Sequence, residues 1–204
     1  FLRGLSFVFM QIFFYIAVIN MNFATAITLT FSSPIFIVVL SMLLLKEKIG
    51  VFRWSAIFIG FSGVLIIMSP SSEVFSIYSI LPLLAALCWA ISNIVLKFIP
   101  DNVSSVKINF YSLNFSYLTC IIILFFTNDV SSVQSSIHWL LMILIGILGG
   151  IASILFSYAY RVISPSTLAP FEYLGIPSSF ILGWLFFNET PIEQLFPGVI
   201  GIVL

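Results

Sequence analysis

Apolar runs of membrane-spanning length, separated by short polar stretches, occupy almost all of this 204-residue chain. A spanning helix needs about 20 predominantly apolar residues, and eight such runs follow one another. Only 7% of the residues are charged, whereas soluble domains carry about a quarter. The sequence therefore predicts an all-α polytopic membrane protein and excludes a soluble globular domain.

The polar stretches set the limits of the predicted spans. The eight spans are 3–20, 23–45, 52–69, 78–98, 106–127, 138–160, 165–187 and 193–204. The last span, at about 1.5 Å per residue, crosses little more than half of a hydrocarbon core of about 30 Å. Because the chain also begins at Phe1 rather than at a methionine, we expect it to be a fragment.

The distribution of basic residues predicts the orientation of the chain. Short connections force neighbouring helices to run antiparallel, so the side of each loop can be counted. All seven basic residues then fall on one side: Arg3, Lys46, Lys48, Arg53, Lys97, Lys107 and Arg161. By the positive-inside rule this side is cytoplasmic. We expect a multi-pass protein of the bacterial inner membrane with its Lys/Arg loops in the cytoplasm.

The chain resembles itself at a shift of 142 residues, which places Phe14 on Phe156 and Glu47 on Glu189. An odd number of spans separates equivalent points, so the two copies face opposite ways. This predicts two inverted repeats with eight helices present of an expected ten: a partial first repeat at 1–70 with its last three helices, a periplasmic linker at 71–77, and a second repeat at 78–204 whose last helix is truncated. Inverted repeats suit alternating access around a midplane site.

Short motifs in both copies resemble the EamA repeat of the drug/metabolite transporter superfamily. They are segments 24–26, 33–36, 44–48 and 60–65, then 86–90, 158–161, 169–173 and 183–189. The resemblance covers essentially the whole chain. It implies ten helices in two inverted repeats and transport of small metabolites that are amino-acid-, nucleoside- or vitamin-like. The second-copy motifs most resemble the branch that contains S-adenosylmethionine and riboflavin transporters, within which the substrate varies.

Glu172 is the acidic residue that falls well inside a predicted span. A carboxylate there costs about 2.5 kcal/mol or more on insertion scales, so it should face a cavity or be protonated. We predict that it pairs with a cationic substrate or carries a proton. The alternative is that Glu172 lies near the interface, where it snorkels or pairs with Arg161.

Helix-breaking residues surround this glutamate. Proline removes a backbone donor and loosens a helix locally, and freed carbonyls are tolerated at membrane depth only beside protein or a water-filled cavity. We predict helix-breaking or gating roles for Pro34, Pro170, Gly175 and Pro177. Ordinary kinking of a membrane helix is the alternative interpretation.

Other polar side chains inside the spans complete a predicted substrate-binding set. Its members are Glu172, Tyr173, Trp89, Asn93, Gln11, Tyr15, Asn114 and Tyr158. Gln11 and Tyr15, like Trp89 and Asn93, are four residues apart and share a helix face. These side chains could bind polar groups while the aromatic rings stack on planar parts. Interhelical hydrogen bonding is the alternative for each residue.

Catalytic and cofactor chemistry lacks support in the sequence. Cys88 and Cys120 lie in apolar runs, which disfavours a disulfide or a metal site, and Walker, HExxH and GxGxxG patterns are absent. Segment 60–63 resembles the GxSG motif of intramembrane serine proteases. Ser62, however, should lie near the midplane and His138 at the outer interface, too far apart for proton transfer.

The sequence therefore predicts a secondary transporter, not an enzyme, that needs no cofactor. Its predicted partners are the lipid bilayer and a small-molecule substrate, with protons as a candidate coupling ion, a homodimer left open and no nucleic acid. The alternatives are a facilitative channel and a membrane scaffold that transports nothing. A channel should show flux that does not saturate, and a scaffold needs no polar groups at the midplane.

Overall fold

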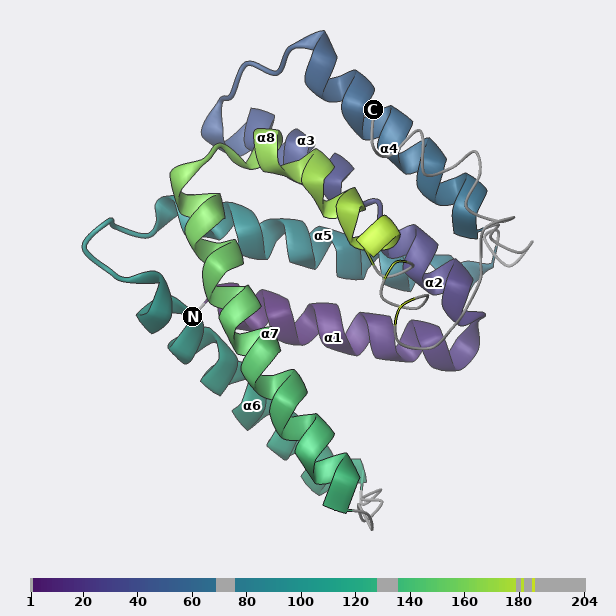
Figure 1. Ribbon diagram of the computed structural model, residues 1–204, viewed down its shortest axis with the longest axis vertical. Helices are drawn as coiled ribbons and strands as arrows, with labels where there is room; N and C mark the ends of the chain where they lie inside the picture. Colours follow the sequence, from purple (N-terminus) through teal and green to yellow (C-terminus); the bar gives the residue numbers. More distant parts are fainter. Residues whose placement is uncertain (1, 69–75, 128–135, 179–180, 182–184, 186–204) are drawn as a thin grey trace.

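The computed structural model describes residues 2–68, 76–127, 136–178, 181 and 185, and every regular element in these parts is helical (Figure 1). In chain order the elements are α1 Leu2–Asn20, α2 Phe23–Thr30, α3 Ser33–Leu45, α4 Val51–Met68, η2 Ile77–Ser79, α5 Ile80–Val95, η3 Leu96–Phe98, α6 Ser105–Thr127, α7 Ser136–Val162, α8 Pro165–Leu168 and η4 Ala169–Leu174. The predicted all-α fold is confirmed.

Four helical stretches in the described residues are long and apolar enough to cross a membrane. They are Leu2–Asn20, Thr25–Leu45, Ile77–Phe98 and Ile137–Val162, and α4 contributes a shorter apolar helix, Val51–Ile67. Predicted span 106–127 coincides with α6. This helix carries more polar side chains than the four stretches above. Predicted span 193–204 and most of 179–187 lie outside the described residues.

The predicted span 23–45 is broken rather than continuous. Helix α2 ends at Thr30 and α3 begins at Ser33, next to Pro34. A proline ring clashes with the carbonyl four residues earlier, here that of Thr30, and offers no N–H to bond it. The Ser32 backbone N–H and hydroxyl instead donate to the Leu29 carbonyl at 3.1 and 2.7 Å. The break lies directly before Ser33, whose side chain contacts Glu172.

The segment after α7 is also irregular. A single α-turn, α8, passes into the six-residue 3₁₀ helix η4, and residues 175–178 return to α-helix. Pro170 lies in this 3₁₀ segment. Runs of 3₁₀ helix longer than three or four residues are uncommon and often mark functional hinges. Glu172 lies within η4.

Helix α5 is central to the packing. It contacts α1, α2 and α3. The main core joins buried side chains from α3, α4, α5, α6 and α7: Ile37, Val38, Ile57, Ala90, Ile94, Ile108 and Tyr160. A second core packs α4 against η4 through Val64 and Tyr173. The two cores thus pack η4, which carries Glu172, against helices that are distant from it in sequence.

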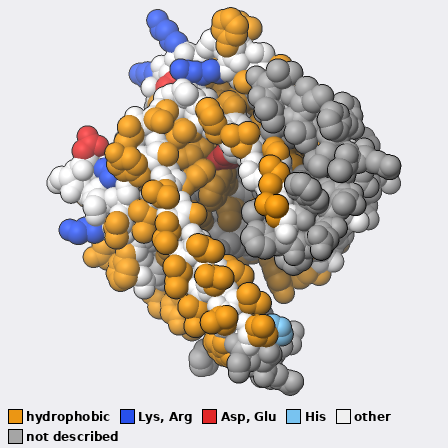
Figure 2. Space-filling model, viewed as in Figure 1, with side chains coloured by type: hydrophobic (Ala, Val, Ile, Leu, Met, Phe, Trp, Pro, Cys, Tyr) orange, Lys and Arg blue, Asp and Glu red, His pale blue; other side chains and the backbone are white. Residues whose placement is uncertain are grey.

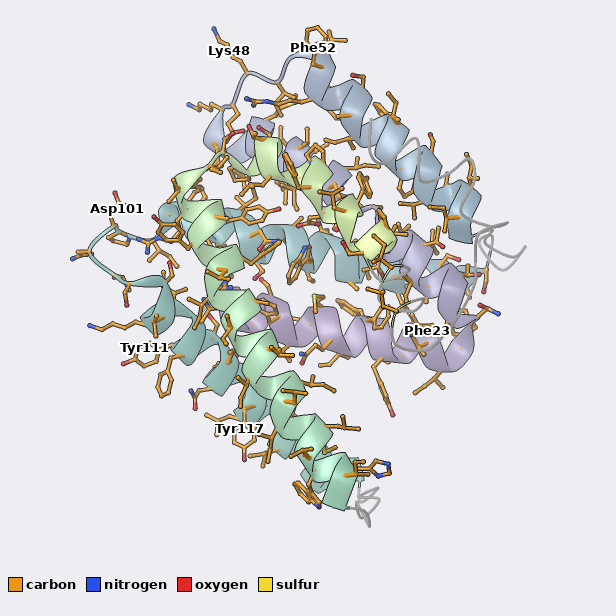
Figure 3. The ribbon with its side chains drawn as sticks, viewed as in Figure 1. Phe23, Lys48, Phe52, Asp101, Tyr111 and Tyr117 are labelled. Carbon is orange, nitrogen blue, oxygen red and sulfur yellow. The ribbon has the colours of Figure 1, made fainter. Side chains whose placement is uncertain are left out.

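Lysine and arginine side chains gather along one edge of the molecule (Figure 2). Lys48 and Asp101 project outward at this edge (Figure 3). Side chains also tie the edge together. Lys97 Nζ donates to the Arg161 carbonyl at 2.7 Å, and Arg161 donates to the Pro100 carbonyl at 3.0 Å. These bonds connect the segment after α5 to the end of α7. We call the side of the molecule that carries Lys48, Lys97 and Arg161 the basic edge.

Candidate functional site

Three side chains from three different helices donate hydrogen bonds to Glu172. Ser33 Oγ of α3 donates to Oε2 at 3.0 Å. Trp89 Nε1 of α5 and Tyr160 OH of α7 donate to Oε1 at 3.1 and 2.8 Å. Both carboxylate oxygens are therefore satisfied by neutral donors, and the carboxylate links η4 to three helices.

Arg161 does not pair with this carboxylate. Its guanidinium lies 3.7 Å from Asp101 and donates to the Val103 carbonyl at 2.5 Å. Among the residues that the structure describes, no basic side chain lies within ion-pair distance of Glu172. A positive charge brought into the site would therefore meet a carboxylate with no cation of its own.

The carboxylate borders a cavity of about 390 Å³. Its polar lining comes from Glu172, Ser33, Thr30 and Trp89, and its apolar lining is mainly aromatic: Phe14, Phe31, Phe156, with Met10 and Ile27. The Trp89 ring lies 5.5 Å from that of Phe156. A few convergent polar groups within an apolar wall are typical of a small-molecule site.

Gln11 and Tyr15, which the sequence placed in the same set, line a different cavity. It measures about 800 Å³, is almost entirely apolar, and also includes Phe23 and Cys120. Gln11 Oε1 accepts a weak hydrogen bond from Cys120 Sγ at 4.0 Å. Met10 and Phe14 line both cavities, so α1 forms the wall between them.

Asn93 and Tyr173 are buried beside the site without lining its cavity. Asn93 follows Trp89 by one helical turn, is 1% exposed, and makes no hydrogen bond through either amide atom within the part of the chain that the structure describes. The Tyr173 ring packs toward α4, where a Cβ on Gly60 would lie 2.4 Å from Cδ2. The Tyr173 hydroxyl also lacks a hydrogen-bond partner in these described segments.

Asn114 and Tyr158 lie away from this cavity. Asn114 is exposed and donates to the Phe110 carbonyl of its own helix at 2.8 Å. Tyr158 is 62% exposed on α7. Of the proposed helix breakers, Pro34 lies at the start of α3 and Pro170 within η4, while Gly175 and Pro177 lie in the helical residues after η4.

The sequence gives no reason to place Ser33 or Tyr160 in the site, and it places Arg3 only among the basic residues of the predicted cytoplasmic side. The structure instead buries Arg3 to 3% exposure and bonds its guanidinium to Asn109 at 3.1 Å and Ser157 at 2.8 Å. One signal could have found this network. Serine or asparagine recurs on one face of α6 at 105, 109, 112 and 116, and all four side chains are buried.

Helices of membrane-spanning length that converge on a carboxylate beside a largely apolar cavity define a multi-pass membrane protein with an interhelical cavity. The family can be stated more closely. A family model matches residues 1–69 and 76–204, and the chain belongs to the EamA-like transporter family.

Curated relatives include transporters of different cargo. The chain is 33% identical over 178 residues to a riboflavin transporter of Vibrio cholerae, covering 87% of this chain and 59% of the relative. It is 27% identical over 179 residues to an S-adenosylmethionine uptake transporter of Rickettsia conorii, covering 88% and 60%. The pseudopaline exporter CntI of Pseudomonas aeruginosa is 26% identical over 192 residues, covering 94% and 67%.

A solved protein crystal structure shares the fold, with a TM-score of 0.85 and 17% identity over 98% of this chain and 72% of the other. The chain spans about three fifths of the length of the first curated relatives that it matches. The chain therefore has the fold of that structure and belongs to the EamA-like transporter family.

Proposed function

We propose that the protein is a secondary transporter that moves a small organic metabolite across the bacterial inner membrane by alternating access. The proposal rests on the position of Glu172. Its carboxylate borders a cavity and accepts hydrogen bonds from α3, α5 and α7 at the same time. A solute that competes for this carboxylate would weaken contacts between separate helices. Binding is thereby coupled to helix movement, as alternating access requires.

The lining of the cavity favours a substrate that has a planar group and a hydrogen-bond donor or a positive charge. Aromatic rings of Phe31, Trp89 and Phe156 suit a planar group, and Glu172 suits a hydrogen-bond donor or a positive charge. Riboflavin carries a planar ring system with an N–H donor, and S-adenosylmethionine carries an adenine and positive charges. The names of the relatives make these two compounds the first solutes to test.

We propose that the cavity opens on the side opposite the basic edge, and its lining supports this. Met10 and Phe14 lie beyond Phe7 on α1, and Ile27 lies on α2, so the cavity lies away from the basic edge. The bonds of Lys97 and Arg161 hold the basic edge together. If the basic edge is cytoplasmic by the positive-inside rule, this conformation is closed inside and open outside. Protons are the coupling ion that we propose, because Glu172 is the acid in the cavity.

Transport by the full-length protein in proteoliposomes tests this function. We expect saturable uptake of riboflavin or S-adenosylmethionine, and a fall of about 10- to 100-fold in kcat/KM for Glu172→Gln, since an interaction with a charged group contributes about 1.5–3 kcal/mol. Asp101→Asn makes the same chemical change on a fully exposed side chain whose 3.7 Å ion pair with Arg161 contributes little in water, and it should leave transport nearly unchanged. Flux that does not saturate would identify a channel, and unchanged kinetics in Glu172→Gln would remove the carboxylate from the mechanism.

A further inference from the structure

Arg3 is a buried cation held only by neutral groups. Its guanidinium donates to Asn109 Oδ1 at 3.1 Å, Ser112 Oγ at 3.4 Å and Ser157 Oγ at 2.8 Å. Its Nε has no hydrogen-bond partner, and no carboxylate lies within ion-pair distance in the described part of the chain. An ionised side chain in a membrane protein is costly unless paired, so such a residue points to a functional site.

Asn93 is a second anomaly in the same region. The side chain is 1% exposed, and neither Nδ2 nor Oδ1 has a hydrogen-bond partner among the described residues. A buried polar group without a partner destabilises a fold, and an apolar residue of similar shape avoids that cost. A buried, unpaired amide therefore indicates a ligand that is absent from this conformation.

Arg3 and Asn93 lie at the same depth. The rings of Phe7 on α1 and Trp89 on α5 contact each other at 5.6 Å and 82°. The two helices run antiparallel, since Ala17 and Met21 pack near Leu81 at their other ends (Figure 1). Arg3 precedes Phe7 by four residues and Asn93 follows Trp89 by four, so each lies about 6 Å beyond the ring pair toward the basic edge.

We propose that Arg3 and Asn93 form a second subsite, on the basic-edge side of the Phe7–Trp89 ring pair, that binds an oxyanion group, a carboxylate or a phosphate. A guanidinium binds both groups through paired N–H donors, and the free Nε–H of Arg3 is available for this. The Asn93 amide adds another donor. Where the oxyanion belongs to the transported solute, this inference rests on the proposed function.

The subsite is closed in the conformation seen. Ser153 Oγ donates to Asn109 Oδ1 at 2.8 Å, and Asn109 Nδ2 donates to Ser157 Oγ at 2.9 Å, which joins α6 to α7 around Arg3. Movement of α1 away from these helices would release the guanidinium. A zwitterionic solute would then meet Glu172 with its cationic part from one side and Arg3 with its anionic part from the other.

Thermal unfolding of the full-length protein in detergent tests the subsite without any transport assay. Inorganic phosphate replaces chloride at constant ionic strength. We expect phosphate to raise the Tm of the wild type by a few degrees in a saturable way, because a ligand that binds the folded state stabilises it. Arg3→Met and Asn93→Leu should lose this shift, and Arg3→Lys should keep part of it. Lys107→Met, which removes an exposed charge, and Asn20→Ala, which alters an exposed amide, should retain it.

Asn93→Leu also distinguishes a ligand-binding role of Asn93 from a purely structural role. Without phosphate its Tm should equal or exceed that of the wild type, because the change removes an unpaired amide. The inference is overturned by the absence of a saturable shift, by a shift that survives Arg3→Met, or by an Asn93→Leu protein that is less stable yet responds fully to phosphate. None of these results would contradict the proposed transport function, because the transport measurement tests that function separately.

Proteoliposomes distinguish the two sources of the oxyanion. If phosphate inside the vesicles competes with the solute but does not cross the membrane, the oxyanion that binds the subsite is a group of the solute itself. Phosphate that crosses with the solute identifies a free anion. Both effects should disappear in Arg3→Met, and inhibition of equal strength in wild type and Arg3→Met overturns the assignment.

Discussion

Glu172 depends on donors that the chain brings together from distant positions. Tyr160 is twelve residues away in sequence and Ser33 is 139, yet both donate to the same carboxylate. The Tyr160 ring also packs on Phe156 at a centroid distance of 4.8 Å. Removal of its hydroxyl thus changes one hydrogen bond and leaves the packing in place, which allows that bond to be measured.

Tyr160→Phe should lower the Tm of the detergent-solubilised protein by several degrees, since a hydrogen bond to a charged group contributes about 1.5–3 kcal/mol. The same change in a Glu172→Gln background should cost clearly less, because the charged acceptor is gone. A double-mutant cycle measures the coupling. Strictly additive effects would show that the strength of this bond does not depend on the charge of Glu172, contrary to the prediction.

At the scale of elements, irregular helix geometry places the site. The break before Pro34 presents Ser33, and the 3₁₀ segment η4 presents Glu172 and Tyr173 on different sides. Contact between α4 and η4 depends on Gly60, where a Cβ would come within 2.4 Å of the Tyr173 ring. The fit of this glycine therefore fixes where the carboxylate lies.

Gly60→Ala should destabilise the protein by about 1–3 kcal/mol, the usual cost of overpacking, and should weaken solute binding because η4 shifts. Tyr173→Leu introduced beside it should recover part of the stability. Gly146→Ala is the matched control, since nothing lies within 4 Å of a Cβ at that glycine. Equal Tm values for Gly60→Ala and Gly146→Ala would contradict the packing argument.

Most of the helices and two residues that line the cavity, Glu172 and Trp89, could be predicted from the sequence. Span lengths follow from hydropathy, and the prolines indicate where helices 23–45 and 165–187 become irregular. Glu172 stands out because a carboxylate in an apolar run needs a partner. Each of these inferences depends on local sequence alone.

The remainder of the site depends on tertiary packing. Periodicity places Gln11 and Tyr15 on one face of α1, but it does not say which neighbour that face meets, and they line the other cavity. The burial of Arg3 between α6 and α7 likewise cannot be predicted from its position near a helix end. The partners of Glu172 required the three-dimensional arrangement.

For the whole molecule, the two candidate subsites lie on opposite sides of the Phe7–Trp89 ring pair. Bonds at the basic edge and the network around Arg3 close one side, and the cavity beside Glu172 occupies the other. The predicted inverted repeats would supply the second conformation by exchanging the shapes of the two halves. On this account a solute passes from Glu172 toward Arg3 as the helices rearrange.

Solute protection of a cysteine at Thr30, which lines the cavity beside Glu172, tests this account most directly. The Thr30→Cys protein, with Cys88 and Cys120 replaced by alanine, is treated with a membrane-impermeant thiol reagent from either side of oriented vesicles. We predict labelling from the side opposite the basic edge, and at least a several-fold slower reaction when a transported solute is present. Labelling that a transported solute does not slow, or that occurs only from the basic edge, would contradict the account.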